Sequence, residues 1–230
     1  MSPLKENVIV QFYSTSIGKK VVMALTGVML LGFVVMHLLG NLQVFLGADE
    51  FNSYAAFLKS IPGPLWVARL GLIFVFLLHI ITAFKLRSIN KTARPHGYRE
   101  MDTRVADPAS LYMLQTGIVV LLFVVLHLLH FTFGLLQPEF YTFVDSEGRH
   151  DVYKMIVNGF KSGPYSYLYM VAMLAVGYHL SHGFWSMFQT LGVNSPRLTP
   201  FLKNAARGLA ALVAFGYISI PLAVLTGILN

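Results

Sequence analysis

Apolar residues fill five long stretches of this 230-residue chain, and polar residues gather between them. A helix needs about 20 apolar residues to cross a hydrocarbon core about 30 Å thick, and each stretch is long enough. The predicted spans lie near residues 21–46, 65–86, 110–136, 165–190 and 206–229. Proline and glycine precede the second and fourth spans. Pro221 lies in the fifth, where it should kink the helix or mark its last turns.

This pattern predicts an all-α integral membrane protein, with residues 1–230 forming a single domain of five transmembrane helices. Strands are not expected, because open sheet edges cannot be satisfied in lipid. Only 12% of the residues are charged, against about 25% in a typical soluble protein. Cysteine is absent, so the chain has no disulfide, no iron–sulfur cluster of its own and no thiolate zinc site.

The basic residues are unevenly shared between the two ends of the predicted bundle. One end holds 12 of the 17 basic residues, and these are Lys5, Lys19, Lys20, Lys85, Arg87, Lys91, Arg94, Arg99, Arg104, Arg197, Lys203 and Arg207. The positive-inside rule places that end, with the N-terminus, in the cytoplasm. The charge excess is therefore read as a topology signal, and nucleic acid is not an expected partner.

Six histidines lie inside the predicted spans, and each of the first four spans carries at least one: His37, His79, His127, His130, His179 and His182. A single intramembrane histidine is often only hydrogen-bonded to a neighbouring helix. Polar groups in this position are expensive, however, and usually functional. Their recurrence in four successive helices favours a shared function.

The depths of the histidines predict two pairs. At 1.5 Å per residue, His37 and His127 each lie 17 positions from the inner edge of their spans, whereas His79 and His179 each lie 14 positions from the outer edge. The first pair is therefore expected toward the outside and the second toward the cytoplasm, about 16 Å apart. Two opposed histidines at one level suit the two axial faces of a haem, whereas zinc or copper needs three or four convergent ligands.

Two further histidines leave the ligand choice open. His130 and His182 each lie three positions after the better-matched histidine of their helix, or about 4.5 Å along the axis. Depth favours His127 and His179 as ligands, with His130 and His182 as alternates. The histidine that is not a ligand would bind a haem propionate or a quinone, or be satisfied locally.

These features resemble the di-haem cytochrome b anchors of succinate:quinone oxidoreductases, including menaquinol:fumarate reductases. The resemblance covers nearly the whole chain. It is carried by "STSIGKKVVMALTG" (14–27) leading into His37, by the segment around His127, and by "HLSHGFWSMFQTLG" (179–192).

The resemblance implies a first bundle of four helices that binds two b-type haems, with His37, His79, His127 and His179 as iron ligands. It implies a membrane-anchor and electron-transfer subunit of a succinate dehydrogenase or fumarate reductase complex in the bacterial inner membrane. This chain would perform no dicarboxylate chemistry itself. Its partners would be a flavoprotein subunit and an iron–sulfur subunit on the cytoplasmic side.

A quinone, expected to be menaquinone, would exchange electrons near the outer haem. Asn41 and Gln43 could hydrogen-bond a carbonyl, and Glu50 could transfer a proton, although these positions also suit an ordinary solvated loop. The basic segment 85–100 sets the topology, docks the iron–sulfur subunit or pairs with propionates. No span contains Asp or Glu, so no carboxylate proton path through the membrane is expected.

Two other readings compete with this one. The first is a di-haem cytochrome b anchor of another respiratory complex, of the formate dehydrogenase or hydrogenase type, although the spacing around His179 argues against it. The second is a haem-free anchor or transporter. Transporters often have broken helices and charges at the midplane, and this chain has neither.

Overall fold

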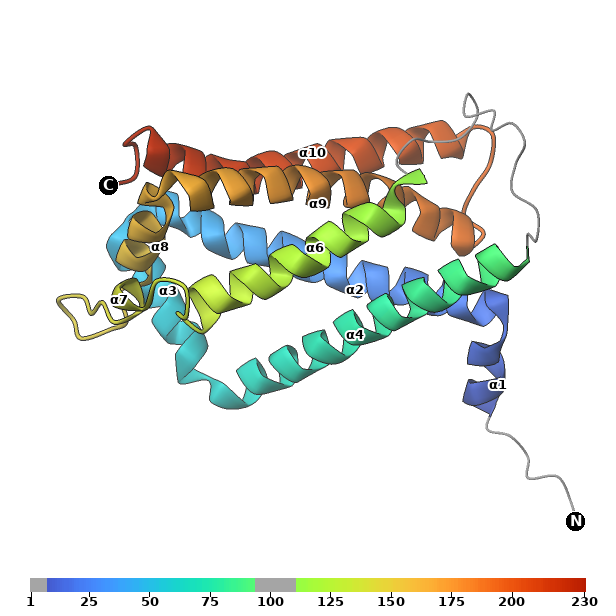
Figure 1. The fold of residues 1–230 in the computed structure, drawn as a ribbon, viewed down its shortest axis with the longest axis horizontal. Coiled ribbons are helices and arrows are strands. Elements are labelled where there is room, and N and C mark those ends of the chain that lie inside the picture. Colours follow the sequence, from blue (N-terminus) through green and yellow to red (C-terminus); the bar gives the residue numbers. More distant parts are fainter. Residues whose placement is uncertain (1–7, 94–110) are drawn as a thin grey trace, which may run out of the picture.

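The computed structural model describes residues 8–93 and 111–230 and shows an antiparallel helical bundle (Figure 1). Five long helices run along the bundle, and shorter helices gather at its two ends. The helices are α1 (Val8–Ser14), α2 (Ser16–Leu42), the 3₁₀ helix η1 (Gln43–Leu46), α3 (Ala48–Ser60), α4 (Pro62–Thr92), α6 (Met113–His127), the π-helix η2 (Leu128–Thr132), α7 (Pro138–Tyr141), α8 (Val152–Lys161), α9 (Gly163–Thr190) and α10 (Leu198–Leu225).

The helix starts follow from local sequence. Thr15 caps α2, because its Oγ1 accepts a hydrogen bond from the Gly18 amide at 2.9 Å. Asp151 caps α8 in the same way through the Lys154 amide at 2.9 Å. Both α4 and α9 have proline in their first turn, where a missing N–H costs nothing.

The all-helical prediction is confirmed for the part of the chain described. Within it, four helical stretches are long and apolar enough to cross a membrane: Ser16–Leu46, Pro62–Thr92, Met113–Thr132 and Leu198–Leu225. The predicted fourth span, near residues 165–190, corresponds to α9, which has 28 residues, as many as α10. Helix α9 is not one of the four, because tyrosines, serines and histidines interrupt its apolar stretch.

Several predicted boundaries were wrong. Helix α4 continues to Thr92, so Lys85, Arg87 and Lys91 lie on its last turns and not in a loop. Helix α10 begins at Leu198, eight residues before the predicted start. The third span leaves α-helical geometry after His127 and ends at Thr132. Lys5, Arg94, Arg99 and Arg104 lie outside the described residues.

Helix α10 packs along α9 through small residues (Figure 1). A Cβ placed on Gly177 of α9 would lie 3.0 Å from the Ala214 Cβ and 3.3 Å from the Ala210 carbonyl oxygen. Small residues let membrane helices approach closely. The seam between α9 and α10 is therefore set by glycine and alanine.

A cluster of buried apolar side chains lies at one end of the bundle, which we call the α8 end. Here α8 lies across the ends of the long helices (Figure 1) and buries Met155, Ile156, Val157 and Phe160. These side chains cluster with others from η1, α3, α9 and α10. The opposite end, which carries α1 and the last turns of α4, is called the α1 end.

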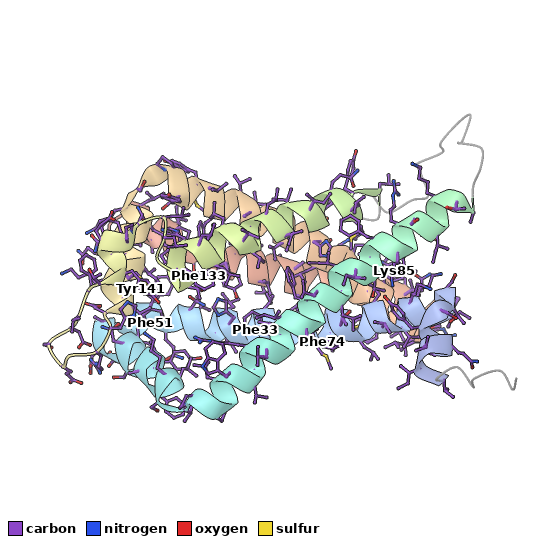
Figure 2. The ribbon with its side chains drawn as sticks, turned by 60° about the horizontal axis from the view of Figure 1, so that its bottom comes forward. Phe33, Phe51, Phe74, Lys85, Phe133 and Tyr141 are labelled. Carbon is purple, nitrogen blue, oxygen red and sulfur yellow. The ribbon has the colours of Figure 1, made fainter. Side chains whose placement is uncertain are left out.

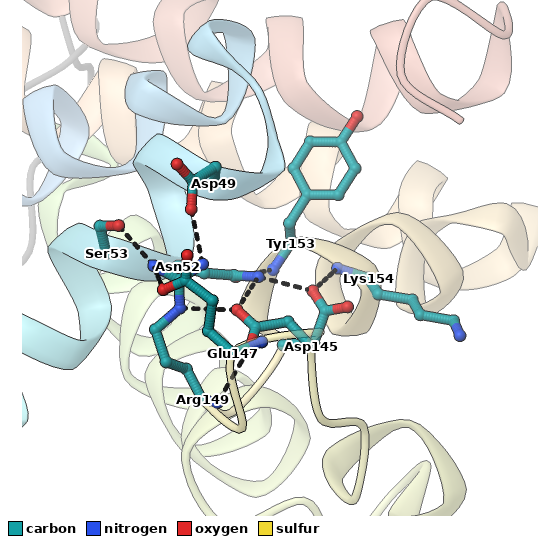
Figure 3. A network of polar contacts seen from close by, with 9 residues as sticks. Asp49, Asn52, Ser53, Asp145, Glu147, Arg149, Tyr153 and Lys154 are labelled. Atoms are coloured by element: carbon teal, nitrogen blue, oxygen red, sulfur yellow. Dashed lines mark hydrogen bonds and ion pairs between the residues drawn. The ribbon is translucent and has the colours of Figure 1, made fainter.

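A polar network joins α3 to the segment between α7 and α8 at this α8 end (Figure 3). Arg149 donates to Asp49 at 2.6 Å, to Ser53 at 2.6 Å and to Asp145 at 2.7 Å. Burial raises the pKa of Asp145, but hydrogen bonds from Arg149 outweigh this and hold the pKa below its ordinary value. The stabilisation is therefore present above the pKa of an unfolded aspartate and is lost as pH falls through the folded value.

Asn52 is the buried centre of this network, with 1% of its surface exposed. Its amide nitrogen lies 3.0 Å from Asp151 and 3.3 Å from Asp145, and its oxygen accepts from the Tyr153 amide at 3.0 Å. The sequence pattern predicted a loop here. The structure has a helix, α3, because Phe51 and Asn52 face the core while Asp49 and Glu50 occupy its first turn.

Replacing Asn52 with alanine should lower the free energy of unfolding by about 1–3 kcal/mol, because buried partners lose their hydrogen bonds. Thermal unfolding of the detergent-purified protein measures the loss. Asn158→Ala is the matched control, because that amide bonds only its own helix, at the Lys154 carbonyl oxygen, in an exposed position. Equal effects of the two substitutions would contradict the role given to Asn52.

Candidate functional site

The histidines of the long helices occupy two levels in the bundle. His37 on α2 and His127 on α6 lie toward the α8 end, and their ring centroids are 5.9 Å apart with the planes 79° to each other. Phe33 stacks on His37 at 5.3 Å. Both histidines are partly exposed. Among the described residues, no hydrogen bond occupies the ring nitrogens of either, so these nitrogens are available to a ligand.

Aromatic side chains surround this pair. Phe123 lies 5.9 Å and Tyr169 lies 6.0 Å from His127, measured between ring centroids. Tyr217 of α10 lies 6.2 Å from His37, and its hydroxyl donates to the Val34 carbonyl oxygen at 2.8 Å. The pair therefore has apolar walls from four helices. Figure 2 shows Phe33 on α2 and Phe74 on α4 midway along the bundle.

His79 and His179 lie toward the α1 end, and each meets a threonine of another helix. His79 Nδ1 lies 3.0 Å from Thr26 Oγ1 of α2. His179 Nδ1 lies 3.2 Å from Thr116 Oγ1 of α6. Both contacts use the nitrogen nearer the backbone, which leaves both Nε2 atoms for other partners.

His130 differs from His127 in its burial and in its hydrogen bonds. It is buried, with 3% of its surface exposed. Its Nδ1 lies 3.1 Å from the Tyr169 hydroxyl, and its Nε2 lies 2.6 Å from Gln137 Oε1. Because Oε1 can only accept, Nε2 carries the proton and Nδ1 accepts from Tyr169. Both nitrogens are occupied, and the π-helical turn η2 holds the ring in this position.

His182 lies one turn beyond His179 on α9, toward the α1 end. Its ring meets the Trp185 ring edge-on, with centroids 6.1 Å apart. Lys203 of α10 places Nζ 4.6 Å from the same indole. The Trp185 indole nitrogen is buried and has no hydrogen-bond partner among the described residues, so it could donate to a bound group such as a propionate.

The donor set fits haem better than a multi-ligand metal ion. The described part of the chain contains no group of three or more His, Cys, Asp or Glu side chains that could hold a metal ion. Paired imidazoles suit the two axial positions of haem iron. Gly27 and Gly117 lie against the pair at the α1 end, because a Cβ there would be in van der Waals contact, 3.7 Å from His79 Cε1 and 3.5 Å from His179 Cε1.

The three residues predicted for quinone lie in one segment at the α8 end but are not joined to each other. The Asn41 amide donates to the His37 carbonyl oxygen at 2.7 Å, within its own helix. Gln43 begins η1, and Glu50 is exposed in the first turn of α3. The segment therefore consists of the end of α2, the 3₁₀ helix η1 and the start of α3, and is not an ordinary loop.

Tyr13 is a site residue that the sequence reasoning missed. Its ring is in contact with two cations, with Lys19 Nζ at 5.5 Å and Lys85 Nζ at 5.0 Å from the centroid. Its hydroxyl lies 3.0 Å from Thr82 Oγ1, less than one turn beyond His79. Figure 2 shows Lys85 on α4 near the α1 end. This contact holds α1 against α2 and α4 beside the second histidine pair.

The fold and these histidine pairs define a class of protein: a multi-pass helical membrane protein with imidazoles paired at two depths. The chain is 28% identical over 209 residues to the succinate dehydrogenase cytochrome b558 subunit of Bacillus subtilis (strain 168), a match that covers 84% of this chain and 93% of the relative. The match confirms the resemblance to the cytochrome b anchors of succinate:quinone oxidoreductases. No family model and no solved structure matches the chain.

The two histidines of the third span should respond differently to removal. His127→Ala should remove one haem per chain, because its ring nitrogens are open to a ligand. His130→Ala should retain both haems and lower the free energy of unfolding by about 1–3 kcal/mol, because Tyr169 and Gln137 lose a buried partner. Haem quantitation per chain and thermal unfolding separate the two. Retention of both haems in His127→Ala would instead assign the ligand role to His130.

Proposed function

We propose that this chain is the membrane-anchor and electron-transfer subunit of a succinate:menaquinone oxidoreductase and holds two b-type haems. His37 and His127 would ligate one iron, and His79 and His179 the other. The observation that carries the proposal is the pairing of imidazoles from four helices at two depths, each with a nitrogen free for iron. The B. subtilis relative, a cytochrome b558 subunit of succinate dehydrogenase, supports the same assignment.

In this proposal α9 also crosses the membrane, as the fourth span along the chain, because its 28 residues are long enough and it packs along α10. The α1 end faces the cytoplasm. Of the described basic residues at that end, Lys19, Lys85 and Lys203 also make the cation–π contacts given above. The iron–sulfur and flavoprotein subunits would dock at this basic end.

Bound haem would supply reversible one-electron chemistry. This chain's own residues would hold each iron between two helices, keep water away with aromatic side chains, and keep the two histidine pairs at levels about 16 Å apart. Electrons would then pass from the α1 end to the α8 end, or in reverse, without a carboxylate inside the spans.

Purification of the complex through a tag on this chain tests the proposal. We expect two haems per chain, reducible by succinate, together with an iron–sulfur subunit and a flavoprotein subunit. A colourless preparation, or one haem per chain, would contradict it. Co-purification of formate dehydrogenase or hydrogenase subunits would assign the chain to another respiratory complex.

The menaquinone site is proposed at the α8 end, near His37, with Asn41 and Gln43 binding a carbonyl and Glu50 exchanging the proton. This end carries both the His37–His127 pair and the polar helix start of α3, and Glu50 is exposed there to solvent protons. The position fits a quinone that takes electrons from one side and protons from the other.

Glu50→Gln should slow succinate-linked menaquinone reduction by about 10²-fold or more, because an acid–base group is removed. Haem content and succinate-dependent dye reduction should not change, since neither needs the quinone. Glu139→Gln on α7 is the control, an exposed carboxylate of the same end. Unchanged menaquinone turnover in Glu50→Gln would exclude Glu50 from proton exchange.

A further inference from the structure

The sequence of α2 is repeated in α6. Residues 25–37 read LTGVMLLGFVVMH, and residues 115–127 read QTGIVVLLFVVLH. Both contain Thr-Gly, then Phe-Val-Val, then a histidine 11 positions after the threonine. Eleven residues of helix span about 16.5 Å, which matches the separation expected between the two histidine levels. Each helix therefore places a histidine at one level and a threonine at the other.

The α2 threonine has a defined hydrogen-bonding role. Thr26 Oγ1 lies 2.8 Å from the Val22 carbonyl oxygen and 3.1 Å from the Met23 carbonyl oxygen, so its single proton is donated within its own helix. The oxygen can then only accept at its contact with His79 Nδ1 at 3.0 Å. His79 is thereby held with the proton on Nδ1 and a lone pair on Nε2.

The α6 threonine repeats this arrangement. Thr116 Oγ1 lies 2.9 Å from the Tyr112 carbonyl oxygen and 3.2 Å from the Met113 carbonyl oxygen of its own helix, and 3.2 Å from His179 Nδ1. The following glycine backs the imidazole in both cases. Two helices related by a sequence repeat therefore orient two histidines from two other helices in the same way.

We propose that Thr26 and Thr116 are matched positioning residues for one haem, the one at the α1 end. The inference rests on the proposed function, because it needs His79 and His179 to share an iron. Each threonine fixes the tautomer and ring orientation of its histidine and increases the basicity of Nε2 toward iron. Each of α2 and α6 thus gives an iron ligand to one haem and an orienting hydroxyl to the other.

Thr26→Val and Thr116→Val test this in the purified complex, because valine keeps the shape and removes the acceptor. Each variant should raise the midpoint potential of the same single haem, because a less basic imidazole stabilises ferric iron less. The double variant should shift that haem further, and its low-spin electron paramagnetic resonance signal should move while the other haem's does not. Thr26→Ser and Thr116→Ser should keep the wild-type midpoint potentials, because serine retains the hydroxyl.

Thr226→Val is the matched control, since Thr226 Oγ1 bonds the Leu222 carbonyl oxygen of its own helix at 2.9 Å in an exposed position.

Loss of the α1-end haem alone in a valine variant, with retention in the serine variant, also supports the proposal. Shifts in two different haems would overturn it, as would no shift with both haems present. Loss of both haems from Thr26→Val and Thr226→Val alike would overturn it too. A wild-type chain without haem would instead refute the proposed function.

Discussion

The structure depends on one constraint: an imidazole inside an apolar helical bundle must have a partner for each ring nitrogen. Water is scarce there, and an unsatisfied polar group costs several kcal/mol. The chain meets the constraint in two ways. His130 is satisfied entirely by protein, through Tyr169 and Gln137. His79 and His179 receive one partner each from threonine, and His37 and His127 receive none within the described residues. The incomplete sets are the ones a prosthetic group would complete.

The long helices and the depths of the histidines could be predicted from the sequence, because both follow from fixed quantities. An apolar run long enough to span lipid is visible in the residues, and a rise of 1.5 Å per residue converts position into depth. The same arithmetic places Thr26 and Thr116 beside His79 and His179. The sequence reasoning saw a late histidine in two helices but missed the threonine that precedes each by 11 positions.

The short helices and the π-turn could not be predicted from the spacing of apolar residues, because they depend on tertiary contacts. Helices α3 and α8 are too short and polar to span a membrane, and each becomes a helix by burying one face against the bundle end. The π-turn that carries His130 gives no sequence signal of its own. The choice of His127 or His130 as the ligand therefore depends on which ring nitrogens have protein partners. The partners of His130 lie 7 and 39 positions away in the sequence.

Helix α10 carries no histidine, yet the close seam that it forms with α9 bears on His179, a proposed iron ligand. Gly177 lies two positions before His179, and it meets Ala210 and Ala214 with no space for a side chain. Such a contact fixes how far α9 is rotated about its own axis, and hence the direction in which its imidazole is aimed. The packing of the fifth helix against α9 would therefore influence the geometry of the proposed cofactor site, although the fifth helix itself supplies no ligand.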